Sequence, residues 1–398
     1  MKYWRGYLTA AIFAAVAWAL TKLAEKFTVL VDMLYPYVTR FLQTMLADWS
    51  GSVNYLLWQV LALGLGLILV FSIVLMVILK WNPIQWLGWV LAFACGLYMI
   101  HTAAYGLNGY AGPLADDIRM EVNEYTVSEL ADATTYYRNQ ANKLANQVER
   151  DENGDVIFPT FQEMAEMAGE GFEYLTYERS FPVFAGSKLP VKELGWADMY
   201  TSMGITGFTF SLTGEAAVNP QIPAVSIPFT MCHEMAHRMC IATERDANLA
   251  AFLASRFHSD VNFQYSAYYM AYRYCYSALA KSGTSAANAL TSQIRDGIND
   301  NLNHDLVAYD AFFNANKDEQ ATKVADTVND TYIKAGGDEQ GVASYGEVCD
   351  LLVNWYIQEI VLPTQIEEEV AFDPFDETQV DLTDLLPESQ TTEPIEES

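Results

Sequence analysis

The chain has 398 residues, 52% of them hydrophobic, and carries 22 Lys and Arg against 50 Asp and Glu, a formal net charge of -28. This charge repels nucleic-acid phosphates, so we expect no nucleic acid among its partners. The five cysteines are odd in number and form no CxxC pair, which argues against a fold based on disulfides.

The long uninterrupted apolar stretches lie before residue 110. Residues 60–79 contain no charged side chain, and these twenty residues are the length that an α-helix needs to cross about 30 Å of hydrocarbon. A second uncharged stretch runs from residue 84 to about 107, and the tryptophans near its start are typical of a membrane interface. We therefore predict membrane-spanning helices over about 57–79 and 84–107, joined by a tight hairpin.

The first hydrophobic segment allows two interpretations. Residues 7–20 are apolar and follow two basic residues, which is typical of a signal peptide, and residues 17–19 form a small-x-small cleavage pattern. Alternatively the segment is a membrane span over about 7–26, in which Lys22 reaches the interface with its long side chain. We favour the span, because the residues that follow are also mostly apolar.

The basic residues around these segments give the expected orientation. Lys2, Arg5 and Lys80 on the cytoplasmic side would place the C-terminal part of the chain outside the cytoplasm. Lys22, Lys26 and Arg40 would then lie on the outer side, which opposes this assignment, so the preference is small. We assign residues 1–110 to a membrane domain of three transmembrane helices, with the lipid bilayer as its partner.

The rest of the chain alternates polar and apolar residues and predicts a mainly α-helical domain over residues 111–362. A capping box of Thr126 and Glu129 predicts the start of one helix. Between residues 204 and 230, breakers and β-branched residues predict a small extended or β element. Further helical patterns lie near residues 160–180, 229–257, 262–282, 285–302, 316–335 and 343–361. Residues 363–398 are rich in Asp and Glu, contain no Lys or Arg, and predict a disordered acidic tail.

An HExxH motif begins at His233 and ends at His237. Residues i and i+4 of a helix share one face, so two imidazoles at this spacing can bind one Zn²⁺ ion. Glu234, between them, is then placed to act as the general base toward a metal-bound water. The alternative is that both histidines are ordinary helix residues without a metal.

The third metal ligand that we expect is Glu244, in an ExxAN element seven residues after His237. On one continuous helix, Glu244 would lie about 10 Å along the axis from His237, too far to share an ion. The helix must therefore break within residues 239–243. Asp246 and His258 are the alternative ligands, and Glu244 could instead serve only as a carboxylate at a helix N-terminus.

Two weaker groups of candidate residues concern substrate binding. Residues 214–219, with Glu215 and Asn219, could form the strand edge along which an extended peptide pairs. Tyr265, together with Tyr268 and Arg273, could donate hydrogen bonds to a developing oxyanion. A structural role is at least as plausible for the strand residues, and an aromatic stripe at helical spacing more often belongs to a hydrophobic core.

Several of these stretches resemble an uncharacterised bacterial membrane family, domain of unknown function 3810. The similar segments are Leu34-Tyr35-Pro36, Tyr105-Gly106-Leu107-Asn108, GITGFTFSLTGEAAVN, IPFTMCHEMAH, ATERDANLAAFLA, QYSAYY and TYIKAGGDEQGVASYGEV. The resemblance implies a multi-pass protein of the bacterial cell membrane with a zincin-like, gluzincin-type metallopeptidase domain. Members usually have Gly where Cys240 stands and Glu where Asp246 stands. If that Gly is the left-handed residue of the helix break, Cys240 costs about 1–2 kcal/mol there.

From these features we expect a membrane-anchored zinc metallopeptidase that hydrolyses an unknown peptide or protein substrate, with its catalytic domain outside the cytoplasm. The alternative is a non-catalytic membrane scaffold that uses a zincin-like groove to bind a partner. Glu234 favours the enzyme, because metal binding alone does not need it.

Overall fold

The computed structural model describes residues 4–335 and 348–364. Residues Met1–Asn354 form one compact unit, and Trp355–Ser398 form a second. Apart from residues 363 and 364, the predicted acidic tail lies outside the described residues. The helices are α1 (Arg5–Lys26), α2 (Thr28–Ser50), α3 (Leu57–Ile78), α4 (Pro83–Ala104), α5 (Leu114–Asp117), α6 (Val127–Ala145), α7 (Phe161–Met167), α8 (Glu170–Tyr177), α9 (Ala197–Ser202), α10 (Ile227–Arg238), α11 (Glu244–Arg256), α12 (Val261–Lys281), α13 (Ser285–Asp296), α14 (Asp300–Asn316), α15 (Glu319–Ala335) and α16 (Val348–Tyr356).

Shorter elements complete this mainly helical fold. They are the 3₁₀ turns η2 (Gly106–Tyr110), η3 (Pro182–Phe184) and η4 (Ala224–Ser226), the π-helical segment η6 (Ile357–Val361), and the strands β1 (Lys192–Glu193), β2 (Gly207–Phe210) and β3 (Glu215–Val218).

Three of the described helices, α1, α3 and α4, are long and apolar enough to cross a membrane. They coincide with the three predicted spans, except that α4 ends at Ala104, a few residues before the predicted end. No residue of α3 is buried in the protein, and most of its apolar side chains are exposed. This exposure in a helix of high hydropathy suggests association with a membrane.

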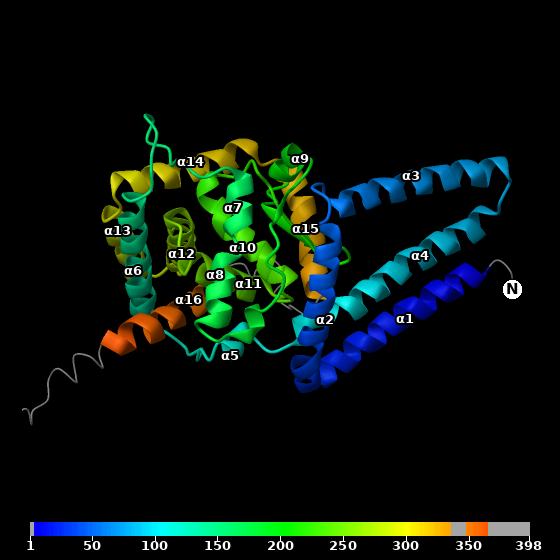
Figure 1. The fold of residues 1–398 in the computed structure, drawn as a ribbon, viewed down its shortest axis with the longest axis horizontal. Helices are drawn as coiled ribbons and strands as arrows, with labels where there is room; N and C mark the ends of the chain where they lie inside the picture. The colour runs from blue at the N-terminus through cyan, green and yellow to red at the C-terminus, as the bar shows by residue number, and fades with distance from the viewer. Residues whose placement is uncertain (1–3, 336–347, 365–398) are drawn as a thin grey trace, which may run out of the picture. The chain divides into compact units, whose positions relative to one another are not determined.

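Helices α1 and α4 lie side by side, as Figure 1 shows. Gly6 of α1 meets the backbone of Gly88, and Phe13 meets Gly96, so the two helices run in the same direction. The buried residues of this contact are small, which lets the two backbones approach closely. The N-terminal end of α1 and the hairpin before α4 therefore lie at the same end of the pair.

Helix α2 packs against the elements that carry the HExxH motif. Gln43 donates a hydrogen bond of 2.8 Å to the carbonyl of Ser211, and the Arg40 Nε donates one of 3.1 Å to the carbonyl of Met239. Both side chains are buried. The sequence indicated only that residues 27–34 are mostly apolar, and α2 links these residues to the helical body.

The small predicted β element is a three-stranded sheet with the order β1-β3-β2. Strand β1 pairs with β3 in parallel, and β2 pairs with β3 in antiparallel orientation. Glu215–Val218 is therefore the middle strand, and our prediction that residues 214–219 form a substrate-binding edge is wrong. The edge strand beside α10 is β2.

The helical body has a core of large aromatic and aliphatic side chains from α6, α8, α11 and α12. Tyr137, Phe172 and Phe252 are completely or almost completely buried. The capping box of Thr126 and Glu129 is present at the start of α6, as predicted. The predicted helices near 160–180 and over 285–302 are each divided in two, into α7 and α8 and into α13 and α14.

Candidate metal centre

The two histidines of the HExxH motif lie on α10, a helix that begins with a proline in its first turn. Proline has no N–H to lose there and its φ is already helical, so it favours this starting point. The Nε2 atoms of His233 and His237 are 3.1 Å apart. The Nδ1 of His237 lies 2.9 Å from the carbonyl of Ile241, which can only accept, so Nδ1 donates and Nε2 faces the cluster.

Helix α10 ends in a Schellman motif, which supplies the predicted break. The N–H of Cys240 bonds to the carbonyl of His237 at 2.9 Å, and that of Ile241 bonds to the carbonyl of Ala236 at 3.1 Å. Cys240 has φ of 70°, in the left-handed region that glycine favours. The chain therefore turns at the residue where the resembled family usually has glycine.

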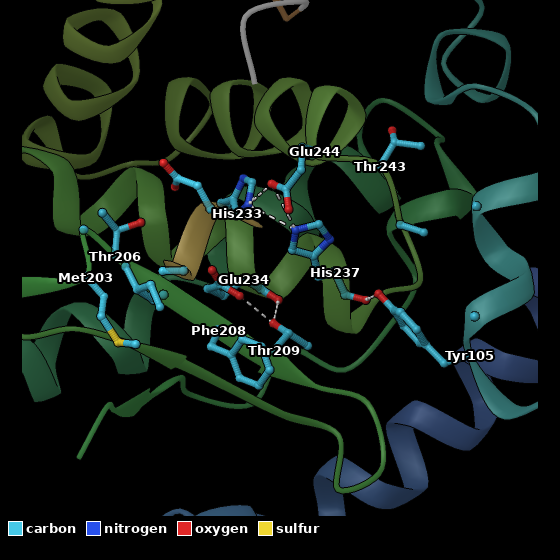
Figure 2. A pocket seen from close by; sticks show the side chains of 18 of the residues that line it. Tyr105, Met203, Thr206, Phe208, Thr209, His233, Glu234, His237, Thr243 and Glu244 are labelled. Carbon is cyan, nitrogen blue, oxygen red and sulfur yellow. Dashed lines mark hydrogen bonds and ion pairs between the residues drawn. The ribbon is translucent and has the colours of Figure 1, made fainter. Parts of the chain in front are cut away.

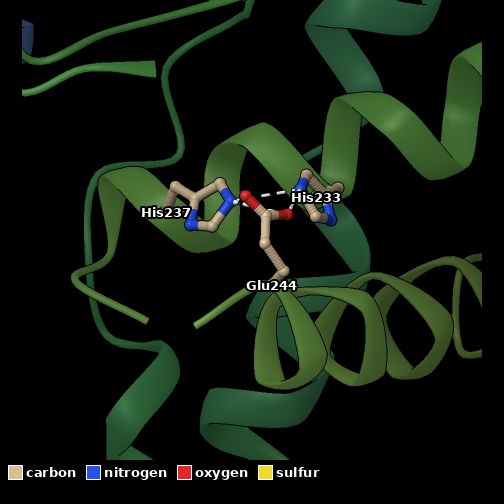
Figure 3. A group of neighbouring side chains, drawn as sticks. All are labelled: His233, His237 and Glu244. Atoms are coloured by element: carbon tan, nitrogen blue, oxygen red, sulfur yellow. Dashed lines mark hydrogen bonds and ion pairs between the residues drawn. The ribbon is translucent and has the colours of Figure 1, made fainter. Parts of the chain in front are cut away.

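Glu244 is the first residue of α11, directly after its N-cap, Thr243. Its Oε2 lies 3.1 Å from the Nε2 of His233 and 3.6 Å from the Nε2 of His237. Figure 3 shows its carboxylate pointing at both imidazoles. One ligand atom from each of these three residues lies within 4.8 Å of the others, close enough to hold one metal ion.

The electrostatics of this cluster suit a cation. Burial alone would raise the pKa of Glu244, but the nearby histidines hold it well below its usual value. Burial disfavours the charged form of His237, yet the carboxylate of Glu244 outweighs this and raises its pKa to about 9. Glu244 Oε2 and His233 Nδ1 are buried polar atoms that form no hydrogen bond. Two imidazoles and one carboxylate are a ligand set that zinc accepts, so the residues fit this metal.

Glu234, the second residue of the motif, is held beside the cluster by strand β2. Thr209 donates a hydrogen bond of 2.7 Å to its Oε2. A Cβ atom at Gly207 would lie 2.4 Å from Glu234 Oε1, so only glycine leaves room for the carboxylate. Burial raises the pKa of Glu234, while the two histidines and Thr209 act in the opposite direction. A carboxylate with a raised pKa is a better proton acceptor from a water molecule.

Residues from distant parts of the chain hold the C-terminal end of α10. The hydroxyl of Tyr105, the residue directly after α4, donates a hydrogen bond of 2.9 Å to the carbonyl of His237. Arg40 of α2 binds the carbonyl of Met239. Carbonyls at a helix end have no partner within the helix, so these bonds fix the end of α10. The cluster is thereby attached to the residue at which an apolar helix ends.

A cavity of about 350 Å³ opens in front of the cluster (Figure 2). Its lining includes His233, Glu234, His237 and Glu244, the edge strand β2, and residues at the end of α4. Ala325 and Asp326 of α15 line another side. Among the residues that the structure describes, no Lys or Arg lines this cavity. A ligand in this cavity therefore reaches the candidate metal ligands and Glu234 together.

The family described as "Protein of unknown function (DUF3810)" matches residues 31–353. The chain belongs to this family. No curated protein and no solved structure matches the chain.

The family match begins within α2 and includes every residue of the metal cluster, whereas α1 precedes it. The description of the family names no function, so membership carries no argument for a reaction.

The other predicted site residues lie away from the cluster. Glu215 accepts hydrogen bonds from the N–H groups of Leu57 and Trp58 at the start of α3. The amide of Asn219 donates to Thr201 Oγ1 at 2.8 Å. Tyr265 is buried and donates to the carboxylate of Asp305. None of these three predicted residues lines the cavity in front of the cluster.

The alternative ligands and oxyanion donors also have other contacts. Asp246 accepts a hydrogen bond of 3.2 Å from the N–H of Leu114, and His258 contacts the carbonyl of Met167 at 2.9 Å. Tyr268 accepts from Arg256. Arg273 forms an ion pair with Asp310 at 3.0 Å. Among the candidate ligands only Glu244 lies with the two histidines.

Proposed function

We propose that this protein is a membrane-anchored zinc metallopeptidase. The observation that carries the proposal is the cluster of His233, His237 and Glu244, with the carboxylate of Glu234 beside it in the same cavity. Two imidazoles and one carboxylate leave a fourth zinc position open, which is typical of catalytic rather than structural zinc sites. A purely structural site would not need Glu234.

The roles of the residues follow from this arrangement. When bound, zinc would supply Lewis acidity to a water molecule and to the scissile carbonyl. Glu234 takes the proton of the water at its carboxylate and passes it to the nitrogen of the leaving amine. Thr209, which donates to Glu234 Oε2, orients that carboxylate. An extended peptide can pair with the unpaired edge of β2, which lies beside Glu234.

The proposal includes three membrane spans, α1, α3 and α4, with the metal centre outside the cytoplasm. The small-residue contact between α1 and α4 supports retention of α1 as a helix of the mature protein. Arg5 and Lys80 lie at the same end of this pair, opposite to the metal centre, which agrees with basic residues on the cytoplasmic side.

The test separates metal binding from turnover. Purified wild-type protein should contain about one zinc ion per chain, as a single three-ligand site predicts, and should cleave a quenched fluorescent peptide library. Glu234→Gln should keep its zinc and lose about 10²- to 10⁴-fold in activity, because its amide cannot accept the proton. Glu193→Gln, the same change at an exposed strand residue, is the control and should alter neither.

The same experiment tests the ligands. His233→Ala and His237→Ala should lose the zinc, and Glu244→Ala should bind it at least about 100-fold more weakly, since even an outer partner is worth about 10- to 100-fold. Wild-type affinity in Glu244→Ala would show that the third ligand is wrong. If Glu234→Gln fully restores the phenotype of a deletion strain, the catalytic proposal should be abandoned in favour of a binding protein.

A further inference from the structure

A second cavity, of about 310 Å³, adjoins the one in front of the metal cluster. The two cavities share four lining residues, His101, Gly106, Phe208 and Thr209, so they lie next to each other. The second cavity, which we call the juxtamembrane cavity, is lined in addition by Thr21 of α1, residues 97, 98 and 102 of α4, and residues 210–212 after and within β2. It therefore connects the metal centre with two of the apolar helices.

The lining of the juxtamembrane cavity is suited to apolar groups. Within the described part of the chain this lining contains no Asp, Glu, Lys or Arg, although the whole chain has a net charge of -28. Leu97 and Tyr98 lie about 10 Å before the end of α4, at 1.5 Å per residue, and thus inside the candidate span. An occupant of this cavity must be uncharged and must extend to the level of the hydrocarbon.

The metal centre is correspondingly close to the end of the spans. Tyr105 follows α4 directly, and its hydroxyl binds the carbonyl of the metal-ligand residue His237. His101, one turn earlier, contacts Ser211 Oγ at 3.0 Å just after β2. No linker separates the end of α4 from the site. A peptide bond at Glu234 would therefore lie near the membrane interface.

Strand β2 lies between the ends of two candidate spans. Phe208 and Phe210 pack on Trp58, in the first turn of α3, with ring centroids 5.6 and 5.5 Å apart. Ser211, the residue directly after β2, contacts His101 in the last turn of α4. A peptide that pairs with the edge of β2 would thus leave the metal cavity in the direction of the membrane helices.

We infer that the substrates of this site are membrane-anchored polypeptides, cut within a few residues of the point where their hydrophobic segment leaves the bilayer. The apolar side chains on the membrane side of the scissile bond occupy the juxtamembrane cavity, and the polar side occupies the cavity in front of the metal cluster. This inference rests on the proposed peptidase function and names its substrate class.

Two matched peptide pools test the inference with the full-length protein in phosphatidylethanolamine–phosphatidylglycerol vesicles. Each peptide of the first pool has a Leu- and Ala-rich transmembrane helix followed by a randomised segment; the second pool has the same segment without the helix. We expect the anchored pool to be cleaved at least about 10-fold faster, with cut sites close to the helix end. Glu234→Gln protein gives the background.

The outcomes separate the inference from the peptidase proposal. Equal cleavage of both pools, or cut sites spread evenly along the segment, would overturn the inference and leave the peptidase proposal standing. If zinc-loaded wild-type protein cleaves neither pool nor the soluble peptide library, the peptidase proposal fails and the inference fails with it.

A variant pair tests the cavity itself. Thr21→Trp introduces a large ring into the juxtamembrane cavity from α1, whereas Leu23→Trp introduces the same ring on an exposed position of the same helix. Thr21→Trp should reduce the ratio of anchored to soluble cleavage about 10-fold or more, and Leu23→Trp should leave it unchanged. Zinc content and melting temperature show that both variants fold. An unchanged ratio in folded Thr21→Trp would contradict binding in this cavity.

Discussion

Cys240 has a left-handed backbone conformation, which its Cβ atom disfavours. Its φ of 70° lies in the left-handed region, where a Cβ atom costs about 1–2 kcal/mol. The side chain is nevertheless buried, and burial raises the pKa of the thiol to about 11, so it remains neutral. The sequence predicted this position from the need for a helix break and from the usual glycine in the resembled family.

Two substitutions at Cys240 separate backbone strain from packing. Both Cys240→Gly and Cys240→Ala remove the buried sulfur, but only glycine also removes the Cβ atom that causes the strain. We expect the Gly variant to be more stable than the Ala variant by about 1 kcal/mol, after the greater freedom of glycine in the unfolded chain is considered. Unfolding in detergent measures both values. An Ala variant that is equally or more stable would show that α10 ends without strain.

The individual residues of the site differ in how far the sequence could predict them. The i, i+4 histidines and the requirement for a break before Glu244 follow from helix geometry, and the structure brings all three side chains together. Thr209, Gly207 and Tyr105 were not predicted, because they contact Glu234 and His237 from β2 and from the residue after α4. Only the tertiary fold joins such distant segments, and no local pattern marks them.

At the scale of the elements, one prediction failed because a strand was assigned to the wrong position in its sheet. All four residues of β3 are buried, as expected of a strand with neighbours on both sides, and the run of small apolar residues after Glu215 could have indicated this. Glu215, its only charged residue, is buried and serves the fold. Its carboxylate accepts from Leu57 N at 2.8 Å and Trp58 N at 2.9 Å, and thereby caps the start of α3.

We therefore expect Glu215 to be a strong determinant of stability. Its carboxylate also pairs with Lys192 at 2.7 Å, and both side chains are largely buried, so Glu215→Ala would leave a buried charge without its partner. The expected loss is about 3–5 kcal/mol. Lys334→Ala, which breaks the more exposed pair with Asp330, should cost no more than about 1 kcal/mol. Unfolding in detergent compares the two variants.

The double variant Lys192→Met with Glu215→Ala is the internal control for this pair. It removes both charges, so it should lose less stability than the sum of the two single variants. Additive losses, or a loss in Glu215→Ala as small as that in Lys334→Ala, would show that the pair does not hold β3 to the start of α3.

At the scale of the molecule, hydropathy predicted which segments are candidate spans, but it could not predict how they meet the rest of the chain. The helices α1, α3 and α4 follow from uninterrupted apolar length. Helix α2 lies between two of these candidate spans in sequence, yet its buried polar side chains bind the residues directly after α10 and β2. Such polar contacts leave no hydrophobic signal, so the attachment of the candidate metal centre to the candidate spans could not be predicted from the sequence.

The orientation of the whole molecule is tested by a pair of single cysteines. Glu193 is an exposed residue of strand β1, and Trp81 is exposed in the hairpin between α3 and α4, at the opposite end of these helices from the candidate metal centre. We expect a membrane-impermeant maleimide to label Glu193→Cys in intact spheroplasts and to label Trp81→Cys only after permeabilisation. The native protein is a suitable background, because four of its five cysteines are buried. The reverse pattern would place the metal centre in the cytoplasm, and equal labelling of both sites would contradict the three spans, since α3 and α4 each separate the two positions.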